Sequence, residues 1–188
     1  MRIILASQSP FRKHALEVLG LAYETLPSNI DESAIRHTDP SQLALLLSQA
    51  KARKIGETEK NAIIIAADLF VVHQGKIIEK PRDEADAQNM LKNFSNQSFQ
   101  IISGLAVYNS ETDQLHSSAD SCQVKFRELT DFEIADYIAR FPALKCAGAF
   151  EADGLLRFAE HIEGNYNFKA GLAVNKLIEF LRINSIKV

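Results

Sequence analysis

The chain has 188 residues, enough for one domain with a core of its own and room for two lobes. Lys and Arg number 21 against 24 Asp and Glu, so the formal net charge is −3. That balance argues against a broad surface for nucleic acid or an anionic membrane, although a small basic pocket remains compatible with it. Hydrophobic residues make up 46% of the chain and charged residues 24%, the composition of an ordinary globular protein.

Cysteine and histidine usage excludes several kinds of metal centre. The two cysteines, Cys122 and Cys146, cannot form a disulfide framework or a cysteine zinc site. The histidines include no i, i+4 pair and no HExxH motif. The apolar run at 3–6 is too brief for a signal sequence, and no run approaches the roughly 18 apolar residues of a membrane span. We therefore expect a cytoplasmic protein that binds no membrane.

The first third of the chain predicts one strand and two helices. Residues 2–6 predict a short strand. Ser9, followed by proline, predicts the N-cap of a helix over 10–20. Asp39, also followed by proline, predicts the start of a second helix over 40–56.

The middle of the chain predicts strands, a hairpin and a third helix. The continuous apolar run at 62–67 is typical of a strand covered on both faces, and Asp68 follows it. Strands over 70–72 and 76–78 are predicted to form a hairpin. Asp83 then predicts the N-cap of a further helix.

The last part of the chain completes an α/β pattern. Two longer strands are predicted over 99–108 and 115–126, and a capping box opens a helix over 130–140. A stretch punctuated by glycine, 146–171, precedes a last amphipathic helix over 172–181. Strands and helices alternate, with antiparallel hairpins inserted. The pattern predicts an α/β fold with a mixed, partly antiparallel sheet flanked by helices.

The first helix carries a local anomaly. Arg12 and Lys13 lie in its first turn, where the helix dipole disfavours cations. The free N–H groups after residues 7–9 form a cradle for an anion, and Arg12 is suited to fork onto phosphate oxygens. The alternative is that both cations are solvated surface charges. The GxxxxGK[ST] pattern of a Walker loop is absent.

Asp68 is the second anomaly, because it adjoins an apolar strand. Burial of an ionised carboxylate is costly unless a cation, metal or hydrogen-bond donor accompanies it. Ligands of open α/β sheets bind beyond the carboxyl ends of the strands, where Asp68 is expected, so we interpret it as functional. The alternative is that it caps a turn. Taken singly, Glu32, Lys51 and Lys80 indicate only solvated or helix-end charges.

Together these residues resemble the Maf family of house-cleaning nucleoside triphosphate pyrophosphatases. The resemblance implies one Maf-like domain over 1–188, with two lobes around a central cleft and a fold like that of inosine triphosphatases. The chain departs from the family at Glu79, usually Gly, and at Ala173, usually Pro. The segments that carry the resemblance are Leu5–Arg12, Asp31-Glu32, Lys51, Ala67-Asp68, Lys80-Pro81, Cys146–Gly148 and Gly171-Leu172.

The resemblance implies a reaction and the residues that perform it. A nucleoside triphosphate is hydrolysed between its α and β phosphates with a divalent metal, Mg²⁺ or Mn²⁺. Glu32 and Asp68 are implied as oxygen ligands of the metal, and Asp68 also as the base that activates water. Both roles need the same carboxylate oxygens, and the sequence does not divide them. The implied phosphate-binding residues are Ser9, Arg12, Lys51 and Lys80.

Three positions bear on the base of the nucleotide. Maf proteins active on dTTP and UTP usually carry Arg, Thr and Gln where this chain has Phe11, Leu69 and Asp153. An aromatic and an acidic residue at the outer two positions resemble the branch that hydrolyses 7-methyl-GTP, although that branch often has Gln at the position of Leu69. The cationic N7-methylguanine ring suits stacking on an aromatic face. A carboxylate accepts the guanine N1–H and N2–H₂, which uracil and thymine cannot match.

We therefore predict a metal-dependent 7-methyl-GTP pyrophosphatase. The alternatives are a dTTP/UTP pyrophosphatase and a nucleotide-binding regulator of cell division without turnover. Phe11 also has an alternative role as a core residue of the first helix. The resemblance suggests a homodimer, and the expected partner is a nucleoside triphosphate rather than a nucleic-acid polymer.

Overall fold

The computed structural model describes residues 1–165 and 167–188. The strands are β1 (Arg2–Leu5), β2 (Glu24–Thr25), β3 (Ala62–His73), β4 (Lys76–Ile78), β5 (Ser98–Asn109), β6 (Gln114–Phe126) and β7 (Ala159–Gly164). The α-helices are α1 (Pro10–Val18), α2 (Pro40–Gly56), α3 (Glu84–Phe94), α4 (Asp131–Arg140), α5 (Ala152–Phe158), α6 (Asn167–Ala170) and α7 (Val174–Ile183). Short 3₁₀ helices are η1 (Glu32–Ala34), η2 (Ala143–Lys145) and η3 (Ala147–Ala149).

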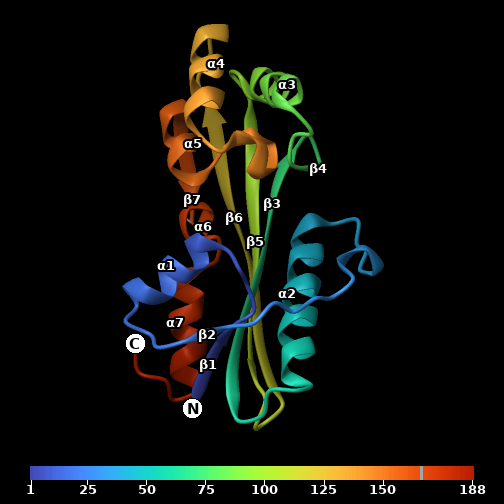
Figure 1. The fold of residues 1–188 in the computed structure, drawn as a ribbon, viewed down its shortest axis with the longest axis vertical. Coiled ribbons are helices and arrows are strands. Elements are labelled where there is room, and N and C mark those ends of the chain that lie inside the picture. The colour runs from blue at the N-terminus through green and yellow to red at the C-terminus, as the bar shows by residue number, and fades with distance from the viewer. Residues whose placement is uncertain (166) are drawn as a thin grey trace. The chain divides into compact units, whose positions relative to one another are not determined.

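The strands of the described residues form one seven-stranded sheet. Its order is β2-β1-β3-β5-β6-β7, and β4 pairs with β3 beside this path. β1 is parallel to β2 and β3, whereas the β3–β4 and β6–β7 pairs are antiparallel. The predicted α/β fold with a mixed, partly antiparallel sheet and flanking helices is therefore confirmed (Figure 1).

The chain divides into two compact units, which are described separately. The first unit comprises Met1–Leu69, Ile102–Asp120 and Asn165–Val188, and the second Phe70–Ile101 and Ser121–Gly164. Strands β3, β5 and β6 each contribute residues to both units. The single Maf-like domain with two lobes around a central cleft stays a prediction.

In the first unit, helices cover both faces of the sheet. Ile64 and Ala66 of β3 share a core cluster with Ala52 and Ile55 of α2. The alternate residues Ile63, Ile65 and Ala67 pack with residues of α1 and α7, which are Leu16, Leu177, Phe180 and Leu181. Figure 1 shows α2 on one side of these strands and α1 with α7 on the other. The apolar run at 62–67 is continuous because side chains on both faces of β3 are buried.

The structure corrects the predicted position of Asp68. It lies inside β3, which continues to His73, rather than after the end of a strand. The predicted hairpin is confirmed by the antiparallel β3–β4 pairing, but its first strand is the continuation of β3. Gln74 and Gly75 form its turn with φ of 49° and 74°, as a two-residue hairpin turn requires. Because side chains alternate along a strand, Asp68 faces α2, as Ile64 and Ala66 do.

The second unit has an aromatic core. The ring of Phe94 in α3 lies 4.7 Å from Phe99 and 6.0 Å from Phe126, between centroids. Phe150 joins the same cluster, 5.6 Å from Phe94. Offset and edge-to-face aromatic contacts of this kind add to the free energy gained by burying the rings. The ring of Phe94 thus packs α3 onto the aromatic residues of β5 and β6.

Tyr137 of α4 is a buried polar group in the second unit. Its hydroxyl accepts a hydrogen bond from the backbone N–H of Glu151, at 3.0 Å, just before α5. Burial raises the pKa of Tyr137 to about 12, so the phenol is neutral at physiological pH. The predicted capping box before α4 is also present, with Thr130 and Glu133 bonding each other's backbone N–H.

The stretch at 146–171 contains more regular structure than its sequence predicts. Helix α5 has only seven residues, and no side chain among the described residues caps it at Glu151. Strand β7 carries the polar residues Glu160, His161 and Glu163, and lacks the apolar alternation of a half-buried strand. It pairs with β6 in a register that includes Gln123 opposite Glu163. Tertiary pairing, rather than a local pattern, therefore defines β7.

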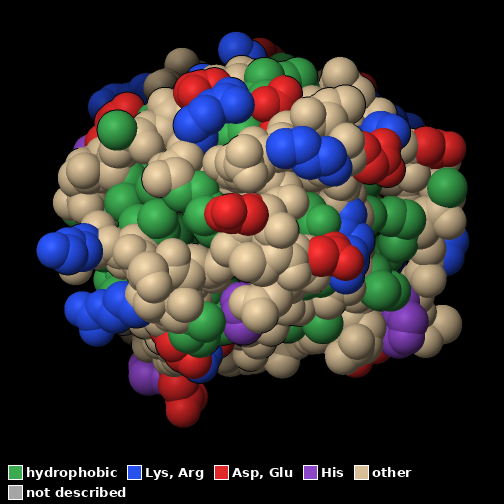
Figure 2. Space-filling model, turned by 90° about the horizontal axis from the view of Figure 1, so that it is seen from below, with side chains coloured by type: hydrophobic (Ala, Val, Ile, Leu, Met, Phe, Trp, Pro, Cys, Tyr) green, Lys and Arg blue, Asp and Glu red, His purple; other side chains and the backbone are tan. Residues whose placement is uncertain are grey.

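The surface reflects the near balance of charge in the sequence. On the face shown in Figure 2, basic and acidic side chains are interspersed among uncharged ones. No helix within residues 1–165 and 167–188 is long and apolar enough to cross a bilayer.

Candidate active site

A polar pocket of about 280 Å³ lies in the first unit, where the chain leaves β1. Its lining includes Ser7 and Arg12 from the β1–α1 segment, Glu32 from η1, and Lys51 from α2. The segment after β1 follows the carboxyl end of a strand that is parallel to its neighbours. Open α/β sheets bind ligands at this edge.

Lys51 bridges the two carboxylates that the sequence singled out. Its Nζ lies 2.8 Å from Glu32 Oε1 and 3.1 Å from Asp68 Oδ1. The side chains of Lys51 and Asp68 are only 10% and 14% exposed, whereas Glu32 is 56% exposed. An ammonium group in such a position is stabilised by both carboxylates, because the partly buried site screens their charges weakly.

The position of Lys51 corrects its interpretation as a helix-end charge. Together with Ala44, Ser48 and Ile55 it lies on the buried face of α2. These residues recur at helical spacing, so the side chain at position 51 points toward the sheet. A cation at an apolar position of the helix period was the sequence signal for this buried site.

Asp68 has one carboxylate oxygen engaged and one without a partner. Its Oδ1 accepts a hydrogen bond from Lys51, and in the described part of the chain no group bonds its buried Oδ2. Leaving a buried acceptor unsatisfied costs about 1–3 kcal/mol. The carboxylate is thus directed at Lys51 from within a strand and does not cap a turn, which excludes the alternative interpretation.

Arg12 is held beside the same carboxylates. Its Nη1 donates to Ser7 Oγ at 3.1 Å, and its Nε donates to the carbonyl of Gly171 at 3.0 Å. Burial lowers the pKa of the Arg12 guanidinium from its ordinary value, while the charges of Asp68 and Glu32 raise it. Arg12 is therefore a positioned cation in the field of two carboxylates and not a solvated surface charge.

Ser7 is a site residue that the sequence motifs did not identify. It is 8% exposed, and its Oγ accepts hydrogen bonds from Arg12 Nη1 and from the backbone N–H of Ser9 at 3.2 Å. The hydroxyl of Ser7 thus connects the guanidinium of Arg12 to the backbone of the segment before α1. A serine directly after the apolar strand, at the carboxyl edge of parallel strands, was the available signal.

The other predicted residues of the first unit lie at its surface or beside Asp68. Ser9 is at the N-cap position of α1, as predicted, although its side chain caps no N–H in the described residues. Phe11, in the first turn of α1, is 37% exposed and belongs to neither core cluster of this unit's described residues. Its side chain thus has the exposure that a stacking role requires. Leu69 is half-buried and follows Asp68 in β3.

Lys80 and Asp153 belong to the second unit. Lys80 is exposed after β4, and its charge lowers the pKa of Cys146, which burial raises by a larger amount. The carbonyl of Glu79 accepts the N–H of Gly148 at 3.1 Å, a contact that needs no glycine at 79. Asp153 is exposed in the first turn of α5.

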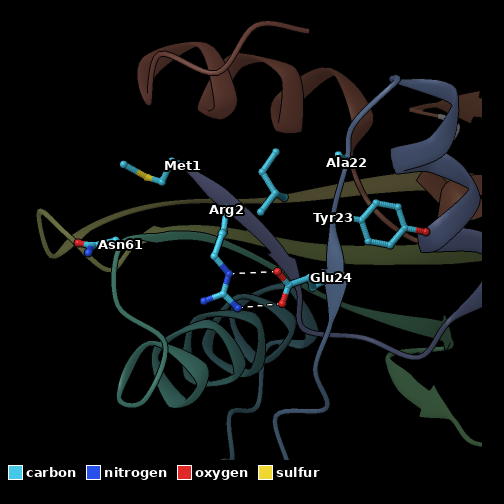
Figure 3. A pocket seen from close by; sticks show the side chains of 7 residues that line it. Met1, Arg2, Ala22, Tyr23, Glu24 and Asn61 are labelled. Carbon is cyan, nitrogen blue, oxygen red and sulfur yellow. Dashed lines mark hydrogen bonds and ion pairs between the residues drawn. The ribbon is translucent and has the colours of Figure 1, made fainter.

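A second, larger pocket of about 610 Å³ in the first unit has a different chemistry (Figure 3). In this pocket the guanidinium of Arg2 donates two hydrogen bonds, of 3.0 and 2.8 Å, to the carboxylate of Glu24. Both groups are about half exposed, at 49% and 55%. Their charges are neutralised by each other in a solvent-exposed pair, so this pocket is a weaker candidate for binding a polyphosphate.

The carboxylates around Lys51 fit a hard divalent cation. In the part of the chain that the structure describes, no group of three or more His, Cys, Asp and Glu side chains could hold a metal. Mg²⁺, however, commonly takes one or two carboxylates and completes its shell with water and substrate phosphates. Glu32 and Asp68 supply such oxygens on either side of Lys51, and Asp68 Oδ2, to which no described group is bonded, is a further buried donor atom.

Cationic groups beside two carboxylates, next to the segment that follows β1, have the chemistry that a polyphosphate and a hard cation require. The chain belongs to the Maf family: residues 2–183 match the model for "Maf-like protein". The resemblance deduced from the motifs is thereby confirmed.

Curated relatives extend over the whole chain. A 7-methyl-GTP pyrophosphatase of Vibrio vulnificus is 36% identical over 100% of this chain and 97% of its own length. A dTTP/UTP pyrophosphatase of Aquifex aeolicus is 36% identical over 97% of this chain and 95% of its own length. One from Bacillus cereus is 33% identical over 100% of this chain and 97% of its own. The protein is therefore a Maf-type pyrophosphatase, a hydrolase acting on acid anhydrides, as expected.

Among solved structures, the Ham1 protein of Staphylococcus aureus aligns with a TM-score of 0.46 and 15% identity. The alignment covers 98% of this chain and 100% of that one.

Proposed function

We propose that this protein hydrolyses 7-methyl-GTP to 7-methyl-GMP and pyrophosphate with Mg²⁺ or Mn²⁺. The observation that carries the reaction is the bridge from Lys51 to Glu32 and Asp68, with Arg12 in the field of the same carboxylates. Phosphoryl transfer depends mainly on positioning and charge stabilisation, and such a cluster supplies both.

Each residue of the cluster has a proposed role. Arg12 and Lys51 neutralise charge on the triphosphate and on the departing pyrophosphate, and the sequence motifs give Ser9 and Lys80 related roles in binding phosphate oxygens. Asp68 orients the attacking water and accepts its proton. Glu32 and Asp68 are the proposed ligands of the divalent cation. When bound, that cation supplies Lewis acidity toward phosphate oxygens and lowers the pKa of water.

The choice of 7-methyl-GTP rests on two exposed side chains. Phe11 presents an aromatic ring at the start of α1, and a positively charged N7-methylguanine is attracted to an aromatic face. Asp153 presents a carboxylate in the first turn of α5, which suits the N1–H and N2–H₂ donors of guanine. The relative from Vibrio vulnificus carries the name of this activity.

A dTTP/UTP pyrophosphatase is the second candidate. The relatives from Aquifex aeolicus and Bacillus cereus bear that name at 36% and 33% identity, similar to the first relative. Leu69, beside Asp68, offers no hydrogen bond to a base and supports neither substrate. The two candidates therefore differ in what they require of Phe11 and Asp153.

The test is steady-state pyrophosphate release from 7-methyl-GTP, GTP, dTTP and UTP with Mg²⁺ and, separately, Mn²⁺. We expect the highest kcat/KM for 7-methyl-GTP. A higher kcat/KM for dTTP or UTP would transfer the assignment to the second candidate. Release from none of the four would contradict the proposed reaction.

Phe11→Ala refines this test. It should lower kcat/KM for 7-methyl-GTP about tenfold and change that for UTP little, because a partly desolvated cation–π contact is worth about 1–2 kcal/mol. Val18→Ala, on the same helix at 71% exposure, is the matched control. Equal losses for both substrates in Phe11→Ala would indicate a packing role.

The cytoplasmic location and the homodimer stay predictions, as does the absence of nucleic-acid and membrane partners. Size-exclusion chromatography with light scattering measures the oligomeric state.

A further inference from the structure

We propose that Lys51 acts as a built-in counter-ion that keeps the divalent cation out of the free site, so that cation and nucleotide bind together. This inference rests on the proposed function for the identity of the nucleotide. It assigns Lys51 a second role besides binding phosphate. Its evidence is the geometry of the four charged side chains in the first unit.

The charges of the four side chains in the cluster balance one another. Arg12 and Lys51 carry two positive charges, and Glu32 and Asp68 carry two negative ones, so the described cluster sums to zero. A divalent cation taken up alone would leave the site with two uncompensated positive charges in a partly buried place. Such an excess is unfavourable where water screens little.

Lys51 competes with a divalent cation for the carboxylate oxygens of Glu32 and Asp68. The ammonium of Lys51 contacts one oxygen of each carboxylate, at 2.8 Å and 3.1 Å. A cation that draws oxygens from both Glu32 and Asp68 must therefore displace Lys51 or lie next to its positive charge. Lys51 contacts only one oxygen of each carboxylate, so a cation could reach the second oxygens, of which Asp68 Oδ2 is buried, only by lying beside the ammonium group. The positive charge of Lys51 at that distance opposes the binding of Mg²⁺ or Mn²⁺ to these oxygens.

A bound nucleotide changes both the charge of the site and the acceptors available to Lys51. A triphosphate brings several negative charges, which restore the balance and offer Lys51 new acceptors. Lys51 has a flexible stem and three donors, so it is able to exchange carboxylate oxygens for phosphate oxygens. The carboxylates are then released to the cation. Nucleotide and cation thus strengthen each other's binding, and by linkage the two effects are equal.

The test measures Mn²⁺ binding to the full-length protein by the electron paramagnetic resonance signal of free Mn²⁺. Lys51→Met keeps the length of the side chain and removes its charge. Without nucleotide, we expect Lys51→Met to bind Mn²⁺ about tenfold more tightly than wild type, since a competing charge is lost. Lys54→Met is the matched control on the same helix, because Lys54 pairs only with the exposed Glu57 among its described contacts. It should leave the dissociation constant unchanged.

A second arm adds an α,β-methylene analogue of 7-methyl-GTP, which resists cleavage, and the Mn²⁺ that the analogue binds without protein is measured separately and subtracted. After that subtraction, wild type should bind Mn²⁺ at least about fivefold more tightly with the analogue, within the usual range of coupling between sites. The coupling should shrink in Lys51→Met. Asp68→Asn should weaken Mn²⁺ binding in both arms, which identifies the site being measured.

The outcomes separate this inference from the proposed function. Circular dichroism shows whether Lys51→Met is folded. If the folded variant binds Mn²⁺ without nucleotide no more tightly than wild type does, the inference is overturned. If that variant does not fold, equally tight Mn²⁺ binding by wild type with and without the analogue would overturn it. Failure of the proposed function shows instead as absent pyrophosphate release, while the nucleotide-free comparison still decides the role of Lys51.

Discussion

The two units of this protein differ in the side chains that they bury. In the first unit, Lys51 and Asp68 form an ion pair of which only 10% and 14% of the side-chain surfaces are exposed. In the second, aromatic rings centred on Phe94 pack against one another. Apolar burial stabilises a fold without demanding precise directions, whereas burying charged groups costs free energy that their attraction only partly returns. A buried charge cluster is therefore weak evidence for stability and better evidence for function.

The difference predicts that substitutions in the two regions will change different observables. Those in the charge cluster should reduce turnover, and those in the aromatic core should reduce the free energy of unfolding.

The largest effect is expected for Asp68→Asn. The amide keeps the shape of the side chain but neither accepts a proton nor carries charge, so kcat should fall by about 10²–10⁴. Pyrophosphate release from 7-methyl-GTP measures the loss, and urea denaturation checks that the fold survives. Near-normal turnover would remove Asp68 from the reaction and weaken the contrast between the units.

The next effect is on stability. Phe94→Ala should lower the free energy of unfolding by about 3–5 kcal/mol, because Phe94 is 2% exposed at the centre of the aromatic cluster. Phe132→Ala, in the same unit but 79% exposed, is the control and should change stability by no more than about 0.5 kcal/mol. Urea unfolding followed by circular dichroism measures both. Similar losses in the two variants would refute the aromatic core as the source of stability.

A smaller effect is expected where the second unit buries a polar group. Tyr137→Phe removes the hydroxyl that accepts the N–H of Glu151, and should lower stability by about 1–3 kcal/mol. The raised pKa of Tyr137, about 12, adds a dependence on pH. Wild type should lose stability above pH 10, because the tyrosine of the unfolded chain ionises first. If Tyr137→Phe loses stability above pH 10 as wild type does, ionisation of Tyr137 is not the cause of that loss.

The smallest effect is expected for Glu133, a carboxylate whose side chain is 33% exposed. Hydrogen bonds from Arg127, and then from the backbone and hydroxyl of Thr130, lower the pKa of Glu133 from 4.5 to about 2. Its contribution to stability is present above pH 4.5 and is lost as the pH falls toward 2, because the unfolded chain takes up the proton first. Glu133→Gln should flatten this part of the acid unfolding curve, measured by thermal melts between pH 2 and 6. An unchanged slope would contradict the assignment.

Local signals in the sequence predicted much of the fold. Asp39 with Pro40 marked the start of α2, and the Thr130–Glu133 capping box marked α4, because helix caps act within one turn. The continuity of β3 through Asp68 was not predictable from composition, since a charged residue in an apolar run resembles a strand end. Strand β7 lacked an apolar pattern because its pairing with β6 defines it.

The candidate site was predictable in its residue types and less so in its contacts. Motifs pointed to Arg12, Glu32, Lys51 and Asp68, which the structure places together in one unit. The bridging position of Lys51 depends on how α2 packs on the sheet, which no single motif records. The motifs did not assign a role to Ser7, because its contact with the site depends on the Arg12 side chain folding back to its hydroxyl.

The most direct test of the central claim is the identity of the products formed from 7-methyl-GTP by wild type and by Asp68→Asn. Anion-exchange chromatography with phosphorus NMR separates the possibilities. We predict 7-methyl-GMP and pyrophosphate in equal amounts from wild type, with formation of both reduced together by Asp68→Asn. Formation of 7-methyl-GDP and orthophosphate, or no product from wild type, would contradict it.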